Sequence, residues 1–130
     1  MKAFFTVAAL VALAGCATTS SKLTDAAERL DRSAEDLYVE IRRDDDNSDA
    51  AREARRFADA ADELNEDIED GRSREDVRER FSRVAESYHE LRDELDGENL
   101  DSGARKAFAE VTRAYLDLER ELEYRRVSGL

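Results

Sequence analysis

Proline and tryptophan are absent from this 130-residue chain, and cysteine, histidine and methionine each occur once. The lone cysteine, Cys16, excludes a disulfide within the chain, so stability must come from side-chain packing. With His89 the only histidine and Met1 the only methionine, a di-iron bundle site and a histidine–methionine haem site are both disfavoured. A chain without proline in which 42% of residues are charged is typical of long helices with solvated faces.

The charge is strongly one-sided. Aspartate and glutamate number 33 against 21 lysines and arginines, which gives a net charge of −12. Only Lys2, Lys22 and Lys106 are lysine; every other basic residue is arginine. Nucleic acid is not expected as a partner, because phosphate binding needs a basic patch. Anionic lipid headgroups should likewise repel the domain.

The N-terminus has the layout of an export signal. Met1-Lys2 is followed by an uncharged run of twelve residues, Ala3 to Ala14. A bilayer span needs about 20 apolar residues, so this run is too short for a permanent transmembrane helix. It fits the hydrophobic region of a signal peptide, with small residues leading up to Cys16.

The stretch Leu13-Ala14-Gly15-Cys16 resembles the lipobox of bacterial lipoproteins at all four positions. This resemblance covers only residues 1–16. It implies cleavage between Gly15 and Cys16, and attachment of acyl chains such as palmitate at Cys16. Ala17, where enteric lipoproteins kept at the inner membrane have aspartate, favours the outer membrane by the same resemblance. We therefore expect a signal peptide at 1–15, a lipidated cysteine and tether at 16–22, and a domain at 23–126 anchored to the periplasmic face of the outer membrane.

Beyond the tether, apolar residues recur at alternating steps of four and three, the spacing of helices packed at a shallow angle. Four such series occur, each beginning 27 residues after the one before. Their members are Leu23, Ala27, Leu30, Ala34, Leu37 and Ile41; Ala50, Ala54, Phe57, Ala61, Leu64 and Ile68; Val77, Phe81, Val84, Tyr88, Leu91 and Leu95; and Ala104, Phe108, Val111, Tyr115, Leu118 and Leu122.

The breaks between these series predict where the helices end. The acidic stretch 44–49 separates the first two, Gly71 with Ser73 the next two, and Gly97 to Ser102 the last two. We expect helices at about 22–43, 49–70, 74–96 and 102–126. Because every connection is short, the predicted fold is an all-α, up-down-up-down antiparallel four-helix bundle.

Antiparallel pairing also predicts core layers in which large side chains face small ones. One layer should join Phe81 with Ala27, and truncation of a fully buried Phe81 to alanine should cost about 3–5 kcal/mol. Tyr88 and Tyr115 should place their rings in the core and their hydroxyls at a polar neighbour.

Candidate chemistry is sparse. His89 lies off the apolar series and should face water, with Glu86 three residues before it. Asp44 to Asp49 lacks the glycine and glutamate of an EF-hand, which leaves weak cation binding open. Glu28–Arg32, Asp76–Arg80 and Glu79–Arg83 are spaced for ion pairs along exposed helix faces. No catalytic constellation and no cofactor site are recognised, so we expect a protein that is not an enzyme.

The sequence therefore favours a small outer-membrane lipoprotein with a structural or protein-interaction role, bound to the bilayer through Cys16 and presenting acidic faces to an envelope protein. The alternative is a periplasmic bundle that binds a ligand or metal in its interior or acidic loop. A third hypothesis is self-association through Tyr38, Ala58 and Leu116, which flank the apolar series. Partner identity and oligomeric state stay open.

Overall fold

The computed structural model describes the backbone of residues 3–127 and the side chains of residues 22–123. Four helices and no strands make up this part of the chain: α1 (Ala3–Asp44), α2 (Asp49–Glu69), α3 (Arg74–Asp96) and α4 (Ser102–Val127). The predicted all-α class and number of helices are confirmed. The first bundle helix was expected from residue 22, whereas α1 begins at Ala3.

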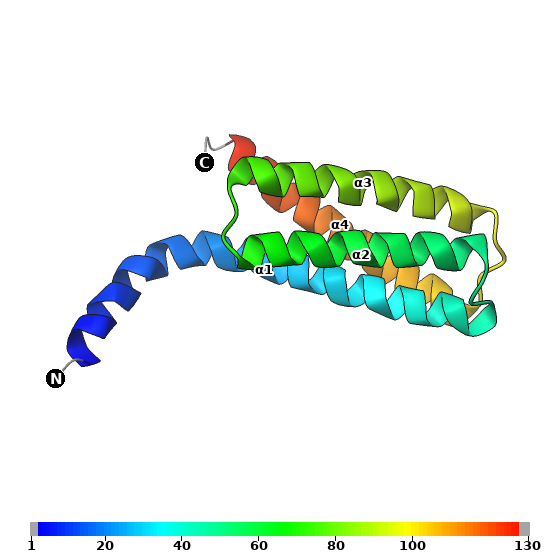
Figure 1. Ribbon diagram of the computed structural model, residues 1–130, viewed down its shortest axis with the longest axis horizontal. Helices are drawn as coiled ribbons and strands as arrows, with labels where there is room; N and C mark the ends of the chain where they lie inside the picture. Colours follow the sequence, from blue (N-terminus) through cyan, green and yellow to red (C-terminus); the bar gives the residue numbers. More distant parts are fainter. Residues whose placement is uncertain (1–2, 128–130) are drawn as a thin grey trace.

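The four helices pack side by side as a bundle, and Figure 1 shows that successive helices run in opposite directions. Helix α1 lies closely against α2 and α4, and α2 lies closely against α3. The connection between α2 and α3 and the C-terminal end of α4 lie at the same end of the bundle (Figure 1). The other two connections lie at the opposite end.

Polar caps fix where three of the helices begin. The hydroxyl of Ser48 accepts a hydrogen bond from the backbone N–H of Ala51, and that of Ser73 accepts one from Asp76. At the start of α4 a carboxylate oxygen of Asp101 accepts from the backbone N–H of Ala104 at 2.8 Å. Such caps satisfy N–H groups that have no partner within the helix.

Side-chain size sets the spacing between helices. Helix α2 buries five alanines, and α1 buries Ala26, Ala27 and Ala34, so these backbones approach closely. Between α3 and α4 the contact is made by large rings instead. Tyr88 stacks on Phe108 and on Tyr115, and Phe81 also stacks on Tyr115. Over the described residues, the α3 and α4 backbones stay farther apart than the other neighbouring pairs.

The core agrees with the predicted apolar series except near the edges. Leu30, Leu37, Phe57, Leu64 and Leu118 are all fully buried. Phe81 and Phe108 are only partly buried, which corrects the expectation of a fully buried Phe81. Both rings lie on the side of the bundle where the α3 and α4 backbones are farther apart, so fewer neighbouring atoms cover them. The buried apolar side chains, from Leu23 to Leu118 in sequence, pack against one another in a single core cluster.

Candidate functional site

Gly15 and Cys16, the predicted cleavage and lipidation residues, lie outside the part of the chain whose side chains are described. The lipoprotein interpretation of the N-terminus therefore stays a prediction. Among the residues searched, no helix combines the length and apolar character needed to cross a bilayer.

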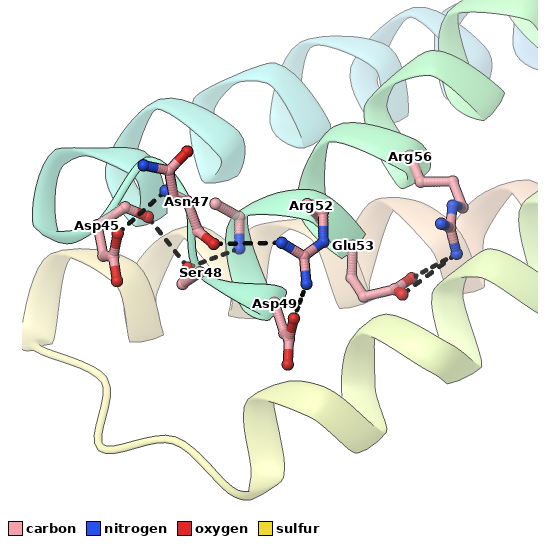
Figure 2. A network of polar contacts seen from close by, with 8 residues as sticks. Asp45, Asn47, Ser48, Asp49, Arg52, Glu53 and Arg56 are labelled. Carbon is pink, nitrogen blue, oxygen red and sulfur yellow. Dashed lines mark hydrogen bonds and ion pairs between the residues drawn. The ribbon is translucent and has the colours of Figure 1, made fainter.

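The acidic loop between α1 and α2 contains a local network of polar contacts (Figure 2). Asp45 accepts a hydrogen bond from the backbone N–H of Asn47 through its side chain, and one from the Ser48 hydroxyl through its carbonyl. Arg52 donates to the carbonyl of Asn47 and forms an ion pair with Asp49. Within the described residues, no group of three or more histidine, cysteine, aspartate or glutamate side chains is arranged to hold a metal ion. The loop's contacts are those of a connection and helix cap.

An aromatic stack occupies the space between α3 and α4. The ring centroids of Tyr88 and Tyr115 are 4.2 Å apart with planes 9° from parallel. The Tyr88 hydroxyl lies 3.0 Å from Oγ1 of Thr112, so the predicted buried ring with a polar neighbour is confirmed for Tyr88. Burial, with the nearby charge of Glu119, raises the pKa of Tyr115 to about 12. This tyrosine therefore stays neutral at physiological pH and acts as a packing group.

His89 is exposed at the edge of this stack, as the sequence predicted. Its ring meets those of Tyr88 and Tyr115 edge-on, with centroids 5.6 and 6.5 Å away. Glu86 is exposed as well. Because the histidine ring is held against two tyrosine rings, it covers the edge of the aromatic stack.

Asp31 on α1, which faces Asp62 on α2, has a strongly perturbed carboxyl group. Burial, reinforced by the negative charges of Asp62 and Glu35, raises the pKa of Asp31 to about 6. The side-chain amide of Asn65 donates to Asp31 at 3.4 Å, while its own carbonyl oxygen is buried without a partner among the described atoms. This face of the bundle therefore concentrates negative charge beside a buried amide.

A second polar contact crosses from α3 to α2. The Nε atom of Arg80 donates to Asp67 at 2.8 Å, and Nη1 of the same guanidinium lies 3.2 Å from Glu63. The Asp67 side chain is only 12% exposed. The sequence had paired Arg80 with Asp76 along α3; that interpretation is wrong, because the guanidinium turns toward α2. The expected Glu79–Arg83 pair does form, at 3.8 Å.

Sequence reasoning missed the Asp31 and Arg80 contacts, although a signal was present. Asn65 and Asp67 lie directly beside the apolar positions Leu64 and Ile68, so polar atoms had to enter the edge of the core there.

The three residues predicted to mediate self-association differ in exposure: Leu116 is 46% exposed, Tyr38 is half-buried, and Ala58 is fully buried inside the bundle. Ala58 is therefore unavailable for self-association.

No protein-family model matches the chain, and neither the curated proteins nor the solved structures yield a similar one.

Proposed function

We propose that this protein is a lipoprotein anchored at Cys16 to the periplasmic face of the outer membrane, with a structural or protein-interaction role. The observation that carries the proposal is the four-residue lipobox at 13–16, placed directly after a twelve-residue uncharged run. Two or more acyl chains hold a protein stably at a bilayer, whereas a single chain binds only marginally. The compact bundle beyond residue 22 supplies a stable body for such an anchor to hold.

Intact mass and membrane fractionation test the anchor directly. The wild-type protein should carry acyl mass and sediment with the outer membrane, and Cys16→Ala should lose both properties. Ala17→Asp is the matched control, because it leaves the lipidated residue in place. It should keep the acyl mass while shifting the protein toward the inner membrane. Wild-type protein without acyl mass would overturn the proposal.

The interaction role rests on the acidic face formed by Asp31, Glu35 and Asp62 on α1 and α2. The raised pKa of Asp31 reflects, after burial, the negative charge of the two neighbouring carboxylates. A surface of this kind is complementary to a basic protein patch, and complementary charge speeds association and selects partners. The acidic face would then point toward the periplasm and bind an envelope protein rich in arginine or lysine.

Charge reversal separates this surface from the general negative charge of the molecule. Glu35→Lys with Asp62→Lys should abolish capture of a saturable partner from envelope extracts. Glu90→Lys with Asp93→Lys makes the same change in net charge at exposed positions on α3 and should leave capture intact. Equal loss in both pairs, or no saturable partner for the wild type, would count against the acidic face as a recognition surface.

A further inference from the structure

A cavity of about 290 Å³ opens at the end of the bundle where α2 connects to α3. Its apolar wall comes from all four helices and consists of Leu23 on α1, Ile68 on α2, Val77 on α3 and Leu122 on α4. Leu23 and Val77 are buried, while Ile68 and Leu122 are partly exposed. The cavity therefore has an apolar wall that is partly open to solvent at Ile68 and Leu122.

Three arginines surround the same cavity: Arg72 in the connection, and Arg74 and Arg78 in the first two turns of α3. Within the described residues, none of these guanidinium groups forms an ion pair or a side-chain hydrogen bond, whereas most other arginines of the bundle are paired with carboxylates. The rim also includes the positive end of the α3 dipole.

The lining contains no carboxylate, in a chain where acidic residues outnumber basic ones 33 to 21. The three other cavities described all include acidic side chains, such as Glu40 and Glu110, Glu119, and Glu28. This cavity thus combines an apolar wall with three arginines, of which Arg78 also lines the adjacent cavity that contains Glu119 and Glu123. The sequence-based expectation that the domain repels anionic headgroups was drawn from the net charge of the whole chain, whereas the lining of this cavity carries arginines and no carboxylate.

We propose that this arginine-rimmed cavity binds a single-chain anionic amphiphile, with the acyl chain on the apolar wall and a carboxylate or phosphate headgroup among the three arginines. Guanidinium groups bind both headgroups through paired, charge-assisted hydrogen bonds. The volume of about 290 Å³ lies just below the usual range for small-molecule sites, about 300–1,000 Å³, which suits one acyl chain better than a two-chain phospholipid.

The position of the cavity suits a ligand taken from the bilayer. Leu23 follows Cys16 by seven residues, a distance of at most about 25 Å even for a fully extended chain. This nearness to the membrane rests on the proposed anchoring at Cys16, whereas the cavity and its charge do not. Binding is therefore measurable on the chain from residue 17 onward, which retains the whole described core.

Titration calorimetry of that chain with decyl phosphate and decanoate, below their micellar concentrations, tests the proposal. The triple variant Arg72→Gln, Arg74→Gln, Arg78→Gln should weaken both ligands at least about tenfold. Its control, Arg52→Gln, Arg56→Gln, Arg113→Gln, removes the same charge at exposed positions outside the cavity and should change affinity less than about twofold. Thr24→Phe, which fills the cavity, should abolish binding while leaving the arginines in place. Circular dichroism verifies that each variant is folded.

Three results would overturn the proposal. Decyl maltoside binding as tightly as decyl phosphate would show that charge plays no part, and inorganic phosphate binding as tightly would show that the acyl chain plays none. Binding to anionic phosphatidylglycerol vesicles without binding to decyl phosphate would make the rim a membrane-surface contact. Since Cys16 is absent from the tested chain, each of these failures would leave the anchoring proposal untouched.

Discussion

Tyr88 on α3 and Tyr115 on α4 stack almost parallel, with ring centroids 4.2 Å apart, and join two helices whose backbones do not pack closely. Phe108 and Phe81 extend the stack on either side. The side of the bundle between α3 and α4 is thus closed by stacked rings, while α2 contributes five buried alanines to its contacts, together with larger side chains such as Phe57. This difference decides which substitutions the bundle tolerates.

Tyr115→Ala should lower the free energy of unfolding by about 3–5 kcal/mol, because it removes a buried ring and its stacking partner contacts. Phe81→Ala should cost only about 1–3 kcal/mol, since that ring is partly exposed. Chemical denaturation of both variants measures the difference. A Phe81→Ala loss as large as that of Tyr115→Ala would contradict the ring exposure described for α3.

Arg80 should contribute more to stability than any exposed ion pair of the bundle. Arg80→Gln leaves the nearly buried Asp67 without its charged partner and should lower the free energy of unfolding by more than the loss of an exposed ion pair does. Arg83→Gln is the matched control on the same helix, because its pair with Glu79 is exposed and should be worth less than about 0.5 kcal/mol. A double-mutant cycle between Arg80 and Asp67 isolates the pair; a coupling energy near zero would remove it as a link between α2 and α3.

The Asp31 carboxyl should make stability depend on pH. Burial first, and then the charge of Asp62, raise its pKa to about 6 from a usual value of 3.8. Between about pH 4 and pH 6, the folded protein therefore keeps a proton on Asp31 that the unfolded chain has already lost. This group's contribution to stability is complete below about pH 4 and is lost as the pH rises through about 6.

Asp31→Asn removes this titration and should be more stable than the wild type at pH 7, by about 1 kcal/mol after allowance for solvent screening. The difference should shrink to near zero at pH 4. Asp36→Asn, at an exposed position on the same helix, is the control and should follow the wild-type profile. Urea denaturation from pH 4 to 7 gives the curves, and parallel profiles for Asp31→Asn and the wild type would rule out the raised pKa.

Gly71 is required by backbone conformation and not by crowding. Its φ of +72° lies in the left-handed region, and an added Cβ would meet nothing within 4 Å. Gly71→Ala should therefore cost about 1–2 kcal/mol from backbone strain alone. Gly97, at the end of α3, has an ordinary φ of −88°, so Gly97→Ala should be neutral or slightly stabilising. Equal melting temperatures for the two variants would contradict the assigned turn.

Ser87 places its hydroxyl in the core without a hydrogen-bond partner among the described atoms. Ser87→Ala removes an unsatisfied polar group and introduces a better helix former, so it should raise the free energy of unfolding by about 0.5–2 kcal/mol. Ser82→Ala is the comparison on the same helix, because the Ser82 hydroxyl is exposed and donates to the Arg78 carbonyl. A loss of stability in Ser87→Ala, measured by thermal denaturation, would mean that the hydroxyl has a partner.

Much of the fold was readable from the sequence because the apolar spacing acts within each helix. The four series that begin at Leu23, Ala50, Val77 and Ala104 predicted four helices, and their members supply nearly all of the observed core. Capping by Ser73 depends on contacts three residues away and was likewise predictable. The lipobox at Cys16 is a property of the sequence alone and stays a prediction about processing.

The rest depended on how helix faces meet. Four features depend on the separation and offset of two or more helices. They are the pairing of Arg80 with Asp67 in place of Asp76, the partial exposure of Phe81, the raised pKa of Asp31, and the position of Arg72, Arg74 and Arg78 around Leu23. Apolar spacing fixes which stripe of a helix faces inward, but not how far apart two helices settle. That separation follows from the side chains of both partners together, alanines in one contact and stacked rings in another, and only the tertiary structure brings those partners into contact.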